Sequence, residues 1–202
     1  MDKYQKKFRI PSTRLTHWDY GSPGLYFVTI CTKNRQLFFG DIVETQDFAS
    51  LDNHPSAENS NAPGINTNTE TQNLASLRTK IGEMAHKYWE DIPTHFPFVE
   101  LDEYVVMPNH VHGILFINKP DYRGWQPNKI GPQSRNLASI IRGYKAAVKT
   151  FATTNQVEFD WQPRFYDHII KSEKELNKIR EYIIFNPAKW NLDRNNLENL
   201  MM

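Results

Sequence analysis

Two apolar runs separated by only two residues constrain the fold more than any other feature of this sequence. The runs are VELDEYVVM, residues 99–107, and HVHGILFI, residues 110–117, and they are split by Pro108 and Asn109. Runs rich in β-branched and aromatic residues around such a dipeptide are typical of a β-hairpin. The sequence therefore predicts two antiparallel neighbouring strands in the middle of the chain.

The segments on either side of this hairpin alternate between strand and helix patterns. GLYFVTICT, residues 24–32, follows the turn residues GSPG, and FYDHIIK, residues 165–171, is another short β-rich run, so both predict strands. Apolar residues recur at helical spacing from about Leu77 to Asp91, which predicts a first helix. The same spacing predicts a second helix through Leu137, Ile140, Ile141, Tyr144 and Val148.

A third helix is expected after the last strand. Ser172 and Glu175 form an S-x-x-E capping box, and Leu176, Ile179 and Ile183 then share one face until Pro187. The first six elements match a ferredoxin-like split βαβ arrangement, an α+β fold with a four-stranded antiparallel sheet and helices on one face. The seventh element is an additional C-terminal helix.

Length and composition favour a single domain in a reducing compartment. The 202 residues suit one domain over residues 1–202, and residues 52–73 are almost free of large apolar side chains, which predicts a disordered insertion. No apolar run approaches the roughly 20 residues of a membrane helix, and the N-terminus lacks a secretory h-region. Cys31 is the single cysteine, which excludes an internal disulfide and a multi-cysteine zinc site. We therefore expect a soluble, cytoplasmic protein without a membrane partner.

The net charge of +1 is unevenly distributed along the chain. Residues 1–40 carry seven Lys and Arg against two Asp and Glu, and residues 104–149 carry seven against one, whereas residues 41–103 carry three against twelve. Two basic blocks on one surface would suit an anionic polymer such as a nucleic acid. Composition alone is equally compatible with ordinary solvated faces.

Two histidines stand one residue apart at the start of the second hairpin strand. Side chains at i and i+2 of a strand point to the same face, so His110 and His112 should project together with Cα atoms about 6–7 Å apart while Val111 points away. Such a pair could share one divalent cation or could simply be hydrogen-bonded. His-x-His also occurs in amidohydrolase barrels, but these require about 250 residues.

The third helix offers a further ligand and a nucleophile. Tyr182 and Asn186 are four residues apart and therefore about 40° from each other around a helix axis. They lie beside the apolar face, so packing this face on the sheet would bring them towards a strand. An amide oxygen can bind a hard cation, and a tyrosine oxygen is a possible nucleophile. An ordinary half-buried aromatic and a helix-terminating residue are the alternatives.

Four motifs in a fixed order resemble the REP-associated tyrosine transposases, single-tyrosine enzymes of the HUH endonuclease superfamily. The motifs are VMPNHVHGIL, SIIRGYKAAV, WQPRFYDHII and IREYIIFNPAKW, after an N-terminal YFVTICTKNR. The resemblance covers roughly residues 9–40 and 77–190. It departs from the family pattern in the segment around residues 52–73 and in the early end after NPAKW.

The resemblance implies a complete reaction. His110, His112 and Asn186 would bind a divalent metal ion, Mg²⁺ or Mn²⁺, and Tyr182 would be the nucleophile. The substrate would be single-stranded DNA beside a hairpin of a palindromic repeat, cut through a 5′-phosphotyrosine intermediate that a second strand transfer reseals. The metal would assist a phenol that is mostly protonated at neutral pH. A nucleoid-associated transposase or domesticated transposase is expected, as a monomer or homodimer, and the chain contains no P-loop.

Basic residues gain a role from this resemblance. Arg142, Lys145 and Lys149 lie at i, i+3 and i+7 of the second helix, opposite its apolar stripe, and could form one ridge along a DNA backbone. Four more candidates for DNA contact lie outside that helix: Arg14, Lys33, Arg35 and Arg164. Each of the seven could equally be solvated.

Three functions stay open at this point. The first is the metal-dependent tyrosine strand transferase, and the second is a catalytically silent regulator of the same fold that only binds DNA hairpins. The third is a metal-dependent phosphodiesterase that activates water, in which Tyr182 would be structural. Replacement of Tyr182 by Phe separates them.

Overall fold

The structure, a computed structural model, describes residues 3–4, 7–8, 18–44, 74–124 and 134–192, so the insertion predicted at 52–73 and Arg14 lie outside the described residues. Its centre is a four-stranded antiparallel sheet in the order β6-β7-β3-β8. The strands are β3 (Gly24–Cys31), β6 (Val99–Met107), β7 (His110–Ile117) and β8 (Tyr166–Ile170). This order, with one helix after β3 and one after β7, confirms the predicted ferredoxin-like α+β fold.

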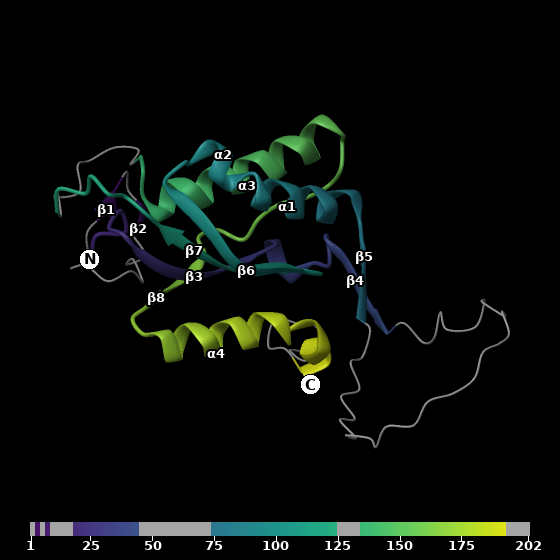
Figure 1. The fold of residues 1–202 in the computed structure, drawn as a ribbon. Coiled ribbons are helices and arrows are strands. Elements are labelled where there is room, and N and C mark those ends of the chain that lie inside the picture. The colour runs from purple at the N-terminus through teal and green to yellow at the C-terminus, as the bar shows by residue number, and fades with distance from the viewer. Residues whose placement is uncertain (1–2, 5–6, 9–17, 45–73, 125–133, 193–202) are drawn as a thin grey trace, which may run out of the picture.

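One face of the sheet carries the main core. The helices α1 (Lys80–Glu90) and α3 (Leu137–Thr154) lie on this face with the short α2 (Ile92–His95) (Figure 1). The Tyr144 hydroxyl of α3 donates to the Ala85 carbonyl of α1 at 3.0 Å. Gly113 of β7 lets α1 approach closely, because a Cβ there would lie 2.2 Å from Cζ2 of Trp89. Helix packing on this side therefore depends on the residue that follows His112.

The opposite face is covered by α4 (Glu173–Ile184), which lies below the sheet in Figure 1. Its predicted apolar face is confirmed, because Leu176 and Ile183 pack on Phe27 and Ile114 of the sheet. The helix follows β8 after only two residues, and Ser172 accepts a hydrogen bond from the Glu175 backbone as its N-cap. The Glu175 carboxylate bonds instead to the Lys171 backbone and to His168, so only half of the predicted capping box forms.

An ion pair fixes α4 against the edge strand. The Arg180 guanidinium donates from Nε and Nη2 to the two oxygens of Asp102 on β6, at 2.8 and 2.5 Å. The bidentate geometry matches the planar fork of arginine. These hydrogen bonds hold the pKa of the Asp102 carboxyl below its usual range. The pair lies one helical half-turn from Tyr182 and so restricts the position of that residue.

Some elements differ from the sequence prediction. The first helix begins at Lys80 and not near Leu77, since residues 74–78 form β5 (Leu74–Arg78), which pairs with β4 (Gly40–Glu44). The Thr79 hydroxyl caps α1 by accepting from the Gly82 backbone. A hairpin of β1 (Lys3–Tyr4) and β2 (Lys7–Phe8) and the 3₁₀ helices η1 (Lys33–Arg35) and η2 (Pro187–Leu192) were not expected. No helix among the described residues is long and apolar enough to cross a membrane.

Candidate active site

The two histidines lie side by side between the sheet and α4. Val111 belongs to the core under α1 and α3, whereas Ile114, two residues after His112, packs under α4, so the strand alternation places His110 and His112 on the α4 face. Both side chains are buried, at 0% and 1% exposure, and their ring centroids are 4.3 Å apart. They are therefore neither surface histidines nor half-exposed ones.

The same ring nitrogen of each histidine faces the protein framework. Nδ1 of His110 lies 2.8 Å from Oδ1 of Asn109, and Nδ1 of His112 lies 2.9 Å from Oγ1 of Thr29. Thr29 is the cross-strand partner of His112 in the β3–β7 register. Both rings thus turn their Nε2 side away from these partners.

Tyr182 reaches this pair from α4 of the same chain. Its hydroxyl lies 3.1 Å from Nε2 of His112, and the two ring centroids are 5.1 Å apart. Phe27 of β3 lies under both rings, stacked on His112 at 5.4 Å and edge-to-face with Tyr182 at 6.2 Å. The tyrosine is 41% exposed although the histidine it touches is buried, so a substrate can approach the phenol from solvent.

Asn186 follows α4 by two residues and is 2% exposed. Its backbone N–H donates to the Ile183 carbonyl, so the chain tightens into a 3₁₀ turn where the helix ends. Trp190 of η2 then packs beside His110, with ring centroids 6.0 Å apart. Asn186 therefore lies in the chain between one residue that contacts His112 and another that contacts His110.

The donor atoms of this site suit a divalent ion with open coordination positions. Among the described residues no group of three or more His, Cys, Asp or Glu side chains comes together as a metal site. An ion here would depend on two imidazoles and an amide, with further positions for water or phosphate oxygens. The ring centroids of the two histidines are 4.3 Å apart, so the imidazoles are close enough neighbours to be considered as ligands of one ion. Imidazole and amide oxygen together are compatible with Mn²⁺ and less favourable for Mg²⁺.

Four neighbours of the site were not singled out from the sequence: Phe27, Thr29, Asn109 and Trp190. The strand alternation of β3 contains the signal for the first two, since positions 27 and 29 share a face and pair across to β7. Asn109 is adjacent to His110, but its orientation is set by distant backbone. The position of Trp190 follows from the turn after α4, for which the sequence offers only Pro187.

Two lysines of the predicted basic ridge of α3 contact backbone carbonyls of a neighbouring segment. The Lys145 ammonium donates to the carbonyls of Gln162 and Arg164 at 2.7 and 3.0 Å, and burial lowers its pKa. The Lys149 ammonium donates to the Phe159 carbonyl in the same segment. Both lysines therefore hold the segment before β8 against α3. A DNA phosphate could contact these ammonium groups without breaking the hydrogen bonds only from the side that faces solvent.

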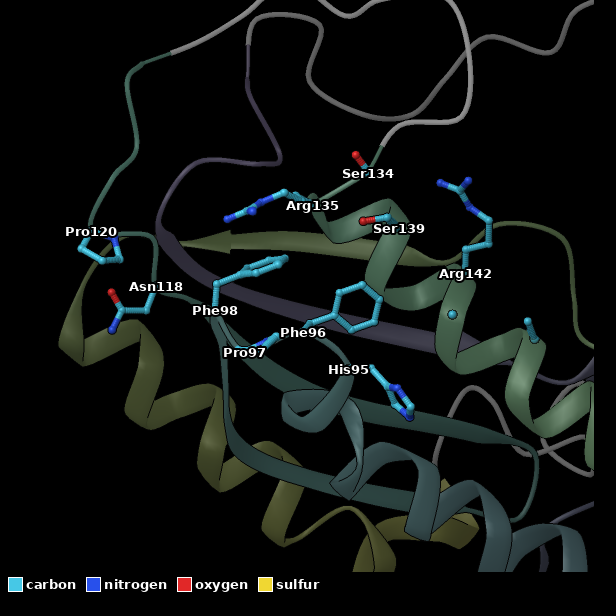
Figure 2. Close-up of a pocket in the computed structure, with 12 residues that line it drawn as sticks. His95, Phe96, Pro97, Phe98, Asn118, Pro120, Ser134, Arg135, Ser139 and Arg142 are labelled. Carbon is cyan, nitrogen blue, oxygen red and sulfur yellow. The ribbon is translucent and has the colours of Figure 1, made fainter.

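Arg142 is among the residues that line a separate cavity of about 870 Å³. Figure 2 shows its side chain there with the rings of Phe96 and Phe98 and the side chain of Arg135. The cavity includes Asn118, which follows the last residue of β7, whereas His110 is the first residue of that strand. Arg142 thus lies at the other end of the strand from the histidines.

Three other predicted DNA contacts, Lys33, Arg35 and Arg164, lie nearer the beginning of β7. The Lys33 ammonium is 3.5 Å from the Asp160 carboxylate, and both side chains are about half exposed. Arg35 has a left-handed backbone with φ 55°, and its carbonyl accepts a hydrogen bond from Asn109. Arg164 is exposed and also has a positive φ of 71°. Arg35 therefore contacts the site through its backbone carbonyl.

Comparison with known proteins gives one long relationship and one partial one. The chain is 37% identical over 193 residues to an uncharacterized protein of Haemophilus influenzae, covering 91% of each. It is 30% identical over 93 residues to a REP-associated tyrosine transposase of Escherichia coli, covering 46% of each. No family model matches the chain.

The fold is shared with a solved structure of a REP-associated tyrosine transposase bound to a REP hairpin. The two superpose with a TM-score of 0.53 over 92% of this chain and 77% of the solved one, at 20% sequence identity. At this identity the likeness concerns the fold alone. Both findings agree with the resemblance to the REP-associated tyrosine transposases that the four motifs indicate.

Proposed function

We propose that this chain is a metal-dependent endonuclease and strand transferase that cuts single-stranded DNA beside a hairpin and keeps the cut strand on Tyr182. The observation that carries the proposal is the 3.1 Å approach of the Tyr182 hydroxyl to Nε2 of His112. A tyrosine that is partly open to solvent and in contact with one of two buried, adjacent histidines is well placed to act as a nucleophile. The partial sequence similarity to a REP-associated tyrosine transposase and the fold shared with one bound to a REP hairpin support DNA as the substrate.

The proposed step exchanges one phosphodiester bond for another. The Tyr182 oxygen attacks the scissile phosphorus, a new O–P bond forms, and the bond from phosphorus to the 3′ oxygen breaks. One proton passes by way of solvent from the phenol to the leaving oxygen, which becomes a 3′-hydroxyl. The 5′-phosphate stays on the tyrosine, so a later attack by a 3′-hydroxyl can reseal DNA without ATP.

The side chains around the phenol divide the remaining tasks. His110, His112 and Asn186 would hold a divalent ion, which supplies positive charge to polarise the phosphate. Phe27 fixes the plane of the His112 ring by stacking and limits the Tyr182 ring from its edge. As a metal ligand His112 would use the lone pair of Nε2, and this one lone pair cannot serve the phenol and an ion together. The hydroxyl must therefore leave His112 before it attacks.

The decisive experiment asks whether the protein becomes covalently attached to DNA. A hairpin oligonucleotide with a single-stranded flank carries one label at its 3′ end and, in a second preparation, one at its 5′ end. With Mn²⁺ we expect the 3′ label to migrate with the protein in a denaturing gel and the 5′ label to appear on a shorter free strand. Tyr182→Phe should abolish both products.

Tyr166 provides a matched control for this substitution. It is another exposed tyrosine of the same sheet face, 53% exposed and 6.3 Å edge-to-face from the Phe27 ring, and within the described part of the chain no hydrogen bond or ring contact to a histidine is found for it. Tyr166→Phe should still form the adduct. Free cleavage products without adduct in the Tyr182→Phe variant would indicate water as the nucleophile. Hairpin binding without cleavage by the unaltered protein would indicate a silent DNA-binding regulator.

A further inference from the structure

The turn between β6 and β7 contains an asparagine whose amide is buried between two fixed partners. Asn109 is 0% exposed, and its Nδ2 donates to the Arg35 carbonyl at 3.0 Å while its Oδ1 lies 2.8 Å from Nδ1 of His110. The Asn109 carbonyl accepts from both the backbone N–H and the hydroxyl of Thr32, at 2.9 and 3.0 Å. These bonds hold the turn in place at both its backbone and its side chain.

The chemistry of these partners leaves a single orientation of the amide. A backbone carbonyl only accepts hydrogen bonds, so the Asn109 group that faces Arg35 must be the amide nitrogen. The oxygen must then face His110, and this oxygen also only accepts. Nδ1 of His110 must therefore carry the proton, and in a neutral imidazole the lone pair is then on Nε2.

We propose that Asn109 is a positioning residue that fixes His110 in the Nδ1–H tautomer and thereby presents its Nε2 lone pair to a metal ion. The proposal rests on the metal-dependent function proposed above. Metal-binding histidines generally donate their second ring N–H to such a partner, and loss of the partner typically lowers metal affinity 10- to 100-fold. Here the Arg35 carbonyl sets the orientation of the Asn109 amide, and the amide oxygen in turn sets the tautomer of the His110 ring.

The turn that presents this carbonyl has an uncommon backbone. Asn34 and Arg35 both have positive φ values, 52° and 55°, which are unfavourable for residues other than glycine. The turn is held by hydrogen bonds from the Arg35 backbone N–H to the Thr32 carbonyl and from the Lys33 backbone N–H to the Asp160 carbonyl. Such conformations persist where the surrounding structure determines them and are common at functional sites. This turn presents the Arg35 carbonyl to the Asn109 amide, so the unfavourable backbone conformation supports the orientation of Asn109.

His112 provides the contrast within the same site. Its Nδ1 faces the Thr29 hydroxyl and its Nε2 faces the Tyr182 hydroxyl. A hydroxyl can donate or accept, so both tautomers of His112 fit these partners. The framework therefore imposes a tautomer on His110 and leaves that of His112 open, which makes Thr29 the matched control for Asn109.

The test reads the tautomer directly, on the full-length protein without metal. Nitrogen-15 NMR of the labelled imidazoles distinguishes a protonated Nδ1 from a protonated Nε2, and we expect His110 to show Nδ1–H in the unaltered protein. Asn109→Leu should give a mixture of tautomers and bind Mn²⁺ 10- to 100-fold more weakly. Thr29→Val should leave the His110 signals unchanged.

The outcomes separate this inference from the proposed function. A protonated Nε2 of His110 in the unaltered protein would overturn the inference even if Asn109→Leu failed to fold. Unchanged Mn²⁺ affinity in a folded Asn109→Leu variant would also overturn it. The absence of a DNA–tyrosine adduct, by contrast, would reject the transferase reaction while the tautomer and the metal affinity could still be as expected.

Discussion

A single methyl group at Gly113 should strongly destabilise the protein. The Cβ of an alanine there would lie 2.2 Å from Cζ2 of Trp89 and 2.9 Å from two more atoms of the indole. The indole cannot move aside easily, because it is 0% exposed and lies against Tyr104 at 6.0 Å and Tyr144 at 5.2 Å between ring centroids. Overpacking of this kind costs about 1–3 kcal/mol, and we expect the upper end.

The expected loss of about 3 kcal/mol corresponds to a fall in Tm of roughly 6–12 °C for a chain of this size. Chemical denaturation followed by circular dichroism at 222 nm measures the change without depending on tryptophan fluorescence. A relaxation of β7 instead of the indole would move the neighbouring His112. The Gly113→Ala variant should then also lose Mn²⁺ affinity.

Trp89→Phe is the companion variant that tests the cause. It removes the atoms that the new methyl group would meet, together with an indole N–H that is buried without a hydrogen-bond partner among the described residues. An unsatisfied buried donor costs about 1–3 kcal/mol, which offsets the lost packing, so Trp89→Phe alone should change stability by about 1 kcal/mol or less. The double variant should be about 2 kcal/mol more stable than the sum of the two predicts. Additive effects, or a Gly113→Ala variant as stable as the unaltered protein, would refute the steric argument.

Three further predictions follow from other contacts. Asp102→Asn should make the free energy of unfolding depend less on pH in the acid range. The Arg180 contact lowers the pKa of the Asp102 carboxyl in the folded state, so the stabilisation from this contact is present at higher pH and is lost as the pH falls below about 3.8. The same acid dependence in the variant and the unaltered protein would contradict this. Thr79→Ala removes the N-cap of α1 and should cost about 1 kcal/mol in denaturant titrations. Tyr182→Phe should raise Mn²⁺ affinity about 2- to 10-fold by calorimetry, since it removes a hydrogen bond of about 0.5–1.5 kcal/mol to Nε2 of His112.

The main sheet could be predicted from sequence because its strands have strong local signals. The hairpin of β6 and β7 has the bounds that the apolar runs and the Pro108–Asn109 turn predict. The strand β5 could not be found in this way, since LASLR has little β preference and its partner β4 is about 30 residues earlier in the chain. Strand formation there depends on pairing more than on composition. The helical spacing of Leu77 with Ile81 then shifted the predicted start of α1.

The approach of Tyr182 to the two histidines could be predicted in part from the sequence. Alternation along β7 places both histidines on one face, and the apolar stripe of α4 fixes which side of that helix meets the sheet, so Tyr182 could be expected near them. The orientation of Asn109 could not, because a backbone carbonyl from a distant turn sets it. The basic ridge of α3 illustrates the same limit, since spacing predicts a shared face but not which carbonyls Lys145 and Lys149 reach.

The short connection between β8 and α4 bears on whether two different inactive variants can restore activity when they are mixed. Lys171 and Ser172 are the whole connection, and so short a stretch reaches at most about 10 Å. We therefore expect the phenol to serve the imidazoles of its own polypeptide, as the contact between Tyr182 and His112 within one chain suggests. If a His112→Ala molecule and a Tyr182→Phe molecule are combined, we expect no complementation, since neither can lend the other its missing group.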